Sequence, residues 1–265
     1  MIQFGDHNPL MMLVCAERVV YNGLLGRLRP RRLGAFTLYV ACGGTLDLTE
    51  GARTLRDRRI ACVPAHAPHR IAAASGAVTA VLIEPETVTD ADLADLAARV
   101  ADPEAGPHLA ARISALRGRL GERFGAGFTA EALDRALFGR PLAPRPMDPR
   151  IAAALRALRD PAPEAPVSAA DGARLAGLSA SRFLHLFKRE TGVRFSALRM
   201  WKRARSVLVH ANREVNLTHL ALDLGYPDST YFSHSIRSIY GMRPRAMFAG
   251  SRNLAILRGA DAPTA

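Results

Sequence analysis

Cysteine is scarce in this 265-residue chain, and long apolar runs are missing from it. The three cysteines, Cys15, Cys42 and Cys62, are scattered and odd in number, which argues against a disulfide framework and gives no metal-ligand spacing. No stretch reaches the roughly eighteen apolar residues of a membrane-spanning helix, and the first residues lack the basic and apolar regions of a secretory signal. We therefore expect free thiols in a cytoplasmic protein without a membrane segment.

Catalytic signatures are missing as well. The sequence contains no glycine-rich phosphate loop, nucleophile elbow or cysteine–histidine pair. The acidic residues Asp47, Glu50 and Asp57 show no pairing that indicates catalysis. These absences predict that the protein is not an enzyme and carries no cofactor.

Lysine occurs only twice, at Lys188 and Lys202, so arginine carries nearly all of the positive charge. Residues 1–146 hold 18 basic and 15 acidic side chains, whereas residues 147–265 hold 18 and 9, which gives formal charges of +3 and +9. A strong positive field suits a segment that binds phosphates. A solvated basic surface has the same composition, so charge alone leaves both interpretations open.

The apolar pattern changes once along the chain. Residues 11–84 contain short apolar runs, such as 36–40 and 78–83, and these predict strands of a sandwich or small barrel. After Pro85 the apolar spacing becomes helical. The expected helices cover about 90–101, 107–123 and 130–138. The expected fold class is therefore α+β.

Four prolines fall within residues 139–149, a density that suits neither a helix nor a strand. We take 139–149 as a linker between a first domain of 1–138 and an all-helical second domain of 150–258. The small, polar residues after about Leu257 predict a frayed tail.

An internal repeat is the strongest signal in the second half of the chain. A small residue, a glycine, two apolar residues four apart and a second glycine recur after 48 or 49 positions. The matched pairs are Ala173 and Ala221, Gly177 and Gly225, Phe183 and Phe232, Phe187 and Ile236, and Gly192 and Gly241. The small residue lets two helices approach closely, and the first glycine tolerates the positive φ of a tight turn. Each copy therefore predicts a helix-turn-helix.

Polar side chains occupy the face opposite the apolar pair in each second helix. They are Ser181, Arg182, His185 and Lys188 in the first copy and Thr230, Ser233, His234 and Arg237 in the second. All of them can donate hydrogen bonds to base edges or phosphates. The spacing alone also fits a plain repeat of helical hairpins whose polar residues only solvate a surface.

The repeat closely resembles the DNA-binding domain of the AraC/XylS family over about residues 148–248. LAGLSASRFLHLFKRETG at 175–192 resembles the first helix-turn-helix of that family. LALDLGY at 220–226 with STYFS at 229–233 resembles the second, YGMRP at 240–244 the end signature, and 201–209 the helix that links the two units. The resemblance implies a domain of seven helices that binds double-stranded promoter DNA as a monomer, with two recognition helices in successive segments of the major groove. RNA polymerase is a further implied partner.

Alignment with the family implies the DNA contacts residue by residue. Base contacts are expected from Ser181, Leu184 and His185 and from Thr230, Ser233 and His234. Phosphate contacts are expected from Arg182, Lys188, Arg189 and Arg237.

Three positions depart from the family pattern. Gly172 replaces a larger aliphatic residue, which predicts a loss of about 1 kcal/mol in the first short helix. Leu184 stands where polar residues are common, so it reads a thymine methyl group or nothing. Met247 and Phe248 replace an aromatic–arginine pair, which predicts a looser final helix.

The first half resembles, more weakly, the cupin-like sensing barrel of many family members, through IACVPAHAPHR at 60–70. His66 and His69 alone cannot complete a metal site, so we expect no metal. Candidate effector contacts are Arg32, Tyr39 and His69, although a structural role for His69 and a solvated strand face for the other two are the more ordinary interpretations. The apolar stripe of 109–120 predicts either core or a homodimer face.

Two alternatives stay open. One is a cupin-type enzyme with a helical appendage, which would bind a stoichiometric transition metal at His66 and His69. The other is a constitutive DNA binder whose first domain serves only to dimerise. The resemblance favours a nucleoid-associated regulator in the cytoplasm, most often an activator in this family, controlled by a small-molecule effector or partner.

Overall fold

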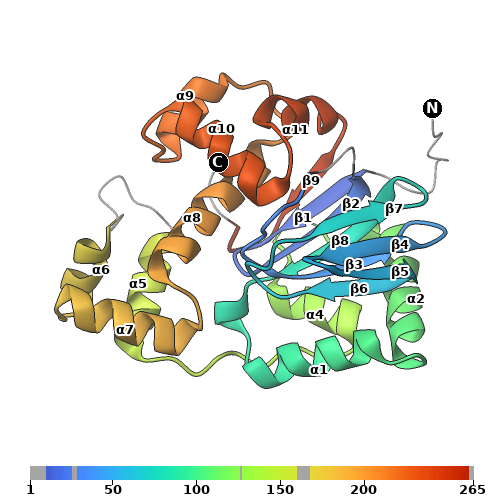
Figure 1. Ribbon diagram of the computed structural model, residues 1–265, viewed down its shortest axis with the longest axis horizontal. Coiled ribbons are helices and arrows are strands. Elements are labelled where there is room, and N and C mark those ends of the chain that lie inside the picture. Colours follow the sequence, from blue (N-terminus) through green and yellow to red (C-terminus); the bar gives the residue numbers. More distant parts are fainter. Residues whose placement is uncertain (1–9, 26–28, 126, 160–167, 263–265) are drawn as a thin grey trace.

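The structure is a computed structural model that describes residues 10–25, 29–125, 127–159 and 168–262. A β-rich part comes first along the chain, and a helical part follows it (Figure 1). This arrangement confirms the predicted α+β class. Within the described residues, the helical part contains the seven α-helices α5–α11.

Nine short strands are present in the described residues. They are β1 (Met11–Val14), β2 (Arg18–Leu24), β3 (Phe36–Ala41), β4 (Leu46–Glu50), β5 (Arg53–Arg58), β6 (Ile60–Val63), β7 (Arg70–Ala73), β8 (Ala77–Ile83) and β9 (Ala255–Arg258). A six-stranded sheet has the order β6-β3-β8-β2-β1-β9, and a three-stranded sheet has the order β5-β4-β7. The β-rich part is therefore a pair of sheets, in line with the sandwich alternative from the apolar pattern and not with the closed barrel implied by the cupin-like resemblance.

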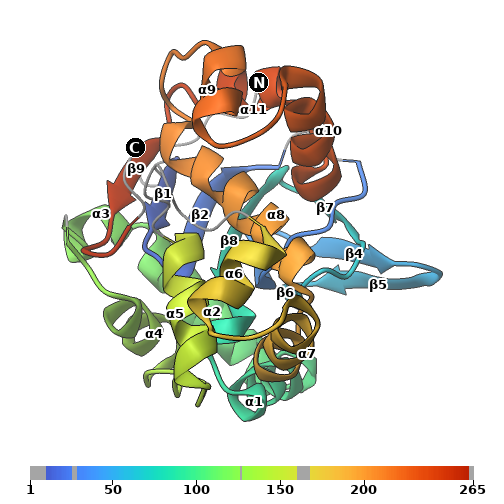
Figure 2. The same ribbon diagram turned by 90° about the vertical axis from the view of Figure 1, so that its left-hand side faces the viewer.

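The larger sheet is buried on both faces, which explains why the apolar runs in β3 and β8 are continuous. Successive side chains of a strand point to opposite faces, so neighbours in β3 belong to different cores. Leu38 packs in a core with α1, α2 and α4, whereas Tyr39 packs with the smaller sheet and the helical part. The β4–β5 hairpin projects beyond this body, and most of β5 is exposed (Figure 2).

The helices of the first part are η1 (Pro85–Thr87), α1 (Asp90–Ala101), α2 (Ala105–Arg117), α3 (Leu120–Arg123) and α4 (Ala130–Phe138). The predicted stripe of 109–120 belongs to this layer. Leu109, Ile113 and Leu120 are buried in the core beneath the sheet, and Leu116 is half-buried against it.

The helical part contains α5 (Pro149–Arg159), α6 (Ala169–Leu175), α7 (Ala180–Thr191), α8 (Phe195–Ser206), η2 (Val207–His210), α9 (Leu217–Asp223), α10 (Ser229–Tyr240) and α11 (Pro244–Gly250). Met247 and Phe248 are both buried in α11, so this final helix packs firmly despite the unusual residue pair.

Residues 139–148 contain neither helix nor strand, and two arginines fix them to α1. Arg140 Nη2 lies 2.7 Å from Asp92 Oδ1, and Arg145 Nη1 donates to Asp90 Oδ2 at 3.0 Å. The proline-rich stretch is therefore packed along the first part of the chain. None of the helices in the described ranges has the length and hydropathy of a membrane span.

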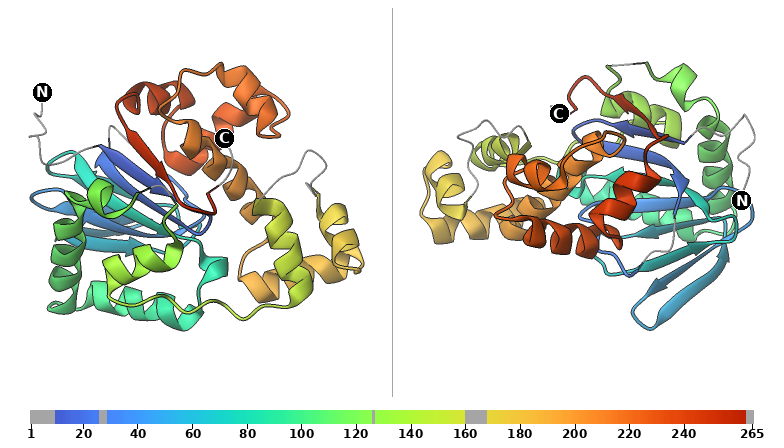
Figure 3. Two further views of the ribbon diagram at one scale, coloured as in Figure 1. Left: turned by 180° about the vertical axis from the view of Figure 1, so that it is seen from behind. Right: turned by 90° about the horizontal axis from the view of Figure 1, so that it is seen from above.

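Residues 263–265 of the expected frayed tail lie outside the described residues. The residues before them are instead held by hydrogen bonds, and they continue directly from the edge strand β9. This strand pairs in parallel with β1, with Leu13 opposite Leu257 (Figure 3). Beyond β9, Gly259 N donates to Val14 O at 2.9 Å, and Ala260 N donates to Phe128 O at 3.0 Å. Composition suggested fraying, but these backbone groups have partners far away in the sequence.

Candidate nucleic-acid interface

The first repeat copy forms a helix-turn-helix from α6 and α7. Gly177 has φ +63°, and the turn closes where Leu178 N donates to Ala173 O at 2.9 Å. Ser179 is the N-cap of α7, and its side chain accepts a hydrogen bond from Arg182 N at 3.4 Å.

The inward face of α7 explains the glycine at position 172. Phe183 and Phe187 are fully buried, and Phe195 packs against both rings at centroid distances of 5.3 and 5.2 Å. A Cβ atom on Gly172 would lie 2.5 Å from the Phe183 ring. The glycine that we predicted to weaken α6 is thus required at this position, because a side chain there would keep Phe183 from packing closely on α6.

The second copy repeats this geometry in α9 and α10. Gly225 has φ +74°, and Tyr226 N donates to Ala221 O at 2.9 Å. Asp228 is the N-cap of α10, since its carboxylate accepts from Tyr231 N at 2.7 Å.

The predicted contact residues lie on the outer faces of α7 and α10. All six in α7 are exposed, namely Ser181, Arg182, Leu184, His185, Lys188 and Arg189. Thr230, Ser233 and His234 are exposed in α10, and Arg237 is half-buried. Each helix therefore presents a polar face outward while its apolar face fills the core.

The DNA contacts predicted from the sequence do not include one large exposed side chain on α10, that of Tyr231. Tyr231 is 51% exposed and stands three residues before His234, so a full helical projection would have placed the two on one face. Its ring lies 6.3 Å from that of Tyr226, which supports it at the start of the helix.

The two units lie at opposite ends of α8, which runs between them (Figures 1 and 2). At the α10 end, the Tyr240 hydroxyl donates to Ala204 O at 3.0 Å. Of the two lysines, only Lys188 is exposed, because Lys202 is buried against the first part of the chain.

A buried ion cluster holds α8 to the first part. It consists of Glu84, Glu86, Lys202 and Arg205. Lys202 Nζ lies 2.7 Å from Glu84 Oε2 and 2.5 Å from Glu86 Oε1, and Arg205 Nε lies 2.8 Å from Glu84 Oε1. Trp201 Nε1 donates to both Glu84 oxygens at 3.0 Å. Burial alone would raise the pKa of Glu84, but Lys202 and Arg205 hold that pKa below its ordinary value.

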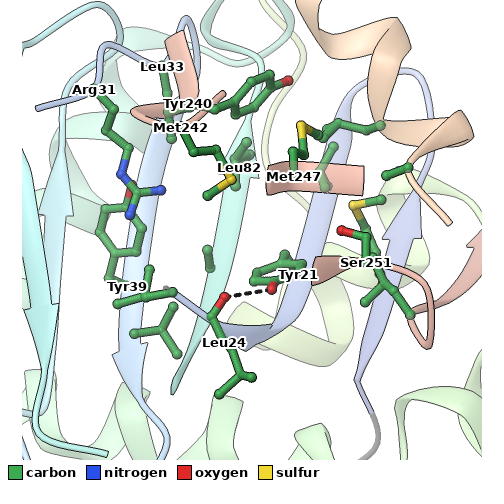
Figure 4. Close-up of a pocket in the computed structure, with 18 residues that line it drawn as sticks. Tyr21, Leu24, Arg31, Leu33, Tyr39, Leu82, Tyr240, Met242, Met247 and Ser251 are labelled. Atoms are coloured by element: carbon green, nitrogen blue, oxygen red, sulfur yellow. Dashed lines mark hydrogen bonds between the residues drawn. The ribbon is translucent and has the colours of Figure 1, made fainter. Parts of the chain in front are cut away.

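A cavity of about 110 Å³ lies between the larger sheet and the helical part (Figure 4). Its wall is mostly apolar, and both parts contribute to it. Tyr39 and Leu82 come from the sheet, whereas Tyr240, Met242 and Met247 come from α10, the turn after it and α11. The cavity thus adjoins the second helix-turn-helix from within the molecule.

Arg31 is the charged residue of this cavity wall, and its neighbour Arg32 is exposed and not part of the wall. Arg31 is 8% exposed, and its guanidinium lies over the Tyr39 ring at 5.3 Å (Figure 4). Its Nε and Nη2 atoms have no hydrogen-bond partner among the described residues. Sequence reasoning selected Arg32 and missed Arg31, because nothing local tells which of two adjacent arginines faces inward.

His69 supports Tyr39 rather than the cavity wall. The Tyr39 hydroxyl lies 2.9 Å from His69 Nε2, and His69 Nδ1 lies 2.9 Å from Ala67 O. Burial lowers the pKa of His69 to about 4, so the ring is neutral at pH 7, with Nδ1 donating and Nε2 accepting. Among the described residues, no group of three or more histidine, cysteine or acidic side chains is placed to hold a metal ion.

Comparison with known proteins agrees with the geometry of the helical part. Residues 173–250 match the family model of a helix-turn-helix domain. The invasion protein InvF of Salmonella typhi and that of Salmonella typhimurium are each 35% identical to this chain over 72 residues. The match covers 27% of this chain and 33% of InvF, so the chain spans about a third of the length of these curated relatives.

Two solved structures that match parts of this chain come from bacteria. Apo ToxT from Vibrio cholerae has 12% identity and a TM-score of 0.49, and the alignment covers 88% of this chain and 97% of ToxT. A transcriptional regulator with an AraC-type DNA-binding domain from Chromobacterium violaceum has 23% identity and a TM-score of 0.35, covering 39% of this chain and 92% of that protein.

Proposed function

We propose that the protein is a transcription regulator of the AraC/XylS type that binds promoter DNA sequence-specifically through α7 and α10, because residues 173–250 match a helix-turn-helix domain and contain two such units. The observation that carries this proposal is the repeated outward face. In both copies, hydrogen-bond donors are exposed where a recognition helix would meet base edges, with His185 and His234 at matched positions. The charge of +9 on residues 147–265 supports phosphate binding.

The test is selection of bound sequences from random duplex DNA. It uses the full chain, because β9 completes the sheet of the first part and a carboxy-terminal fragment would lose that partner. We expect a two-part site whose halves lie about one helical turn apart. Failure to enrich any sequence at low ionic strength would refute the proposal.

We further propose that a small apolar carboxylate controls the protein from the cavity beside Arg31. A buried guanidinium with two unpartnered nitrogen atoms is costly, and a bidentate carboxylate would satisfy both. The volume of about 110 Å³ is smaller than the roughly 150 Å³ of an engineered cavity that holds benzene, so the apolar part of the ligand must be small. Tyr39 would form part of the wall, His69 would fix Tyr39, and Arg32 would take no direct part.

Benzoate is a suitable probe, with benzamide as the neutral control of the same shape. Calorimetric titration should detect benzoate and should show roughly 10- to 100-fold weaker binding after Arg31→Leu, since a hydrogen-bonded charge is removed. Arg32→Leu is the matched control and should bind as the unsubstituted protein does. Equal binding of benzamide would refute the role of Arg31 as an anion anchor.

Activation through RNA polymerase, residence in the cytoplasm and pairing into a homodimer remain parts of the proposal that rest on the AraC/XylS resemblance. A reporter assay at the selected site would separate activation from repression. A DNA binder that ignores benzoate and every other cell metabolite would instead be constitutive.

A further inference from the structure

The two recognition helices end in the same way but in different surroundings. Gly192 ends α7 and Gly241 ends α10, each with φ +74°, and each amide donates back into its helix, to Lys188 O and Arg237 O. Apart from the chain neighbours of Gly192, no described atom lies within 4 Å of a Cβ built on it, whereas a Cβ on Gly241 would lie 2.5 Å from Arg29 O. At the terminal glycine itself, α10 is covered by another segment of the described chain and α7 is not.

The cover is residues 29–32 of the β-rich part, which we call the capping segment. Arg29 N donates to Gly241 O, and Arg32 N donates to Ile239 O, both at 3.1 Å. The last carbonyl groups of a helix have no partner within the helix. The capping segment therefore supplies, from another part of the molecule, donors that α10 needs at its carboxyl end.

The capping segment also carries the charged group of the cavity. The Arg31 side chain faces the cavity, while its backbone exchanges two hydrogen bonds of 2.9 Å with His69. Tyr240 and Met242, which flank Gly241, line the same cavity. Because Arg32 N donates to Ile239 O, an anion bound to the Arg31 side chain would lie one residue away from this contact with α10.

The first recognition helix, α7, contacts the β-rich part at η1 and does not border the cavity. Among the described residues that line the cavity, none comes from α5, α6, α7 or α8. The helix α8 is held separately by the buried ion cluster, and the Trp201 ring fits against Gly34, where a Cβ would lie 2.2 Å from it. The cavity thus borders the second unit directly, whereas the ion cluster holds α8, whose Ala204 O accepts from the Tyr240 hydroxyl.

We propose that the capping segment is an effector-responsive cap of the second recognition helix alone. Ligand binding at Arg31 fixes the segment and orders the last turn of α10. This increases the discrimination between base sequences by the second helix-turn-helix, while α7 is unaffected. This inference rests on the proposed function for its DNA and ligand consequences, but the capping contact itself can be measured without either.

The first experiment measures amide hydrogen exchange in the full chain. Arg29→Pro removes the N–H that donates to Gly241 O, and Arg29→Ala keeps it. Loss of one neutral hydrogen bond predicts exchange roughly 2- to 10-fold faster at 238–241 in Arg29→Pro than in Arg29→Ala, with 189–192 unchanged. Equal exchange in the two variants, or equal acceleration at both helix ends, would overturn the cap.

A second pair of variants uses the two matched glycines. Gly192→Ala and Gly241→Ala impose the same positive-φ strain on their own helices. Only Gly241→Ala would also displace Arg29, so it alone should accelerate exchange at 29–32. If Gly192→Ala disturbs that segment as much, the asymmetry between the two units is wrong.

The third experiment uses the selected duplex with base changes in one half or the other. Compared with Arg29→Ala, Arg29→Pro should discriminate roughly 2- to 10-fold less between the selected and the changed bases in the half-site bound by α10. Its discrimination in the half-site bound by α7 should be unchanged. Equal loss at both halves overturns the inference. If no duplex is selected at all, the proposed function fails, while the exchange experiments still decide whether the cap exists.

Benzoate supplies the ligand arm of the test. It should slow exchange at 238–241 in Arg29→Ala, should have no effect there in Arg31→Leu, and should leave 189–192 unchanged. Protection of both helix ends, or no protection of either, overturns ligand control of the cap.

Discussion

Replacing Glu84 by glutamine should destabilise the protein strongly, because it leaves two buried cations without their main counter-charge. Glu84 is 1% exposed, and the groups that face it are Trp201, Lys202 and Arg205. Glutamine keeps the size of the side chain and an oxygen that accepts from the indole. The variant therefore removes the negative charge with little change of packing.

The expected magnitude follows from the burial of the cluster. Removing one partner of a buried ion pair costs about 3–5 kcal/mol, since the remaining charge stays desolvated. Glu86 remains beside Lys202, but among the described residues it makes no ion pair with Arg205, whose carboxylate partner is Glu84. Urea unfolding followed by circular dichroism should show the loss as a lower midpoint at an unchanged slope.

A matched control lies on the surface. Asp90 pairs with Arg145 but is 84% exposed, so Asp90→Asn should cost no more than about 1 kcal/mol. Lys202→Met combined with Glu84→Gln should cost less than the sum of the two single variants, because the pair is then removed together. Additive losses, or a Glu84→Gln cost no larger than that of Asp90→Asn, would refute the assignment of the cluster as a buried electrostatic contact.

The same cluster sets a dependence on pH. The folded-state pKa of Glu84 lies below its ordinary value of 4.5, so its contribution to stability is present above pH 4.5 and is lost as the pH falls further. Part of the acid sensitivity below pH 4.5 should therefore disappear in Glu84→Gln.

Three further predictions concern single sites. Alanine at His185 or His234 should weaken the free energy of binding to the selected duplex by about 1–3 kcal/mol and leave non-specific binding nearly unchanged. Footprinting against competitor DNA measures both, and wild-type footprints from both variants would contradict the contact assignment. Gly172→Ala should destabilise the protein in thermal unfolding by about 1–3 kcal/mol, because the added methyl group meets Phe183, whereas helix propensity alone predicts a gain. Because burial lowers the pKa of His69 from 6.5 to about 4, stability should fall as the pH drops from 6.5 to 4 and the unfolded chain takes up the proton; His69→Gln should flatten that slope in urea titrations, and an unchanged slope would show that His69 is not the group responsible.

The repeat could be predicted from sequence because its determinants are local. Gly177 and Gly225 adopt the positive φ that their turns require, and Ser179 and Asp228 cap the helices that follow. Helical periodicity alone separated the buried faces of α7 and α10 from the exposed ones. These features depend on residues within one or two turns of each other.

The remaining features depend on contacts between distant residues. Whether short strands close into a barrel or form two sheets is decided by pairing, and β9 pairs with β1 across almost the whole chain. Glu84 meets Lys202 only because η1 packs on α8, and composition gives no sign of it. The choice between Arg31 and Arg32 likewise depends on a bridge to His69.

The position of β9 also bears on how the protein is made. The hydrogen bond from Ala16 to Asp261 spans 245 residues, so at ordinary translation rates β1 leaves the ribosome roughly ten to fifty seconds before its neighbour. During that interval the nascent sheet has an open edge of apolar residues, a site prone to pairing with other chains. Chaperone demand during synthesis should therefore concentrate on β1, and truncation before β9 should yield aggregates even when both helix-turn-helix units are intact.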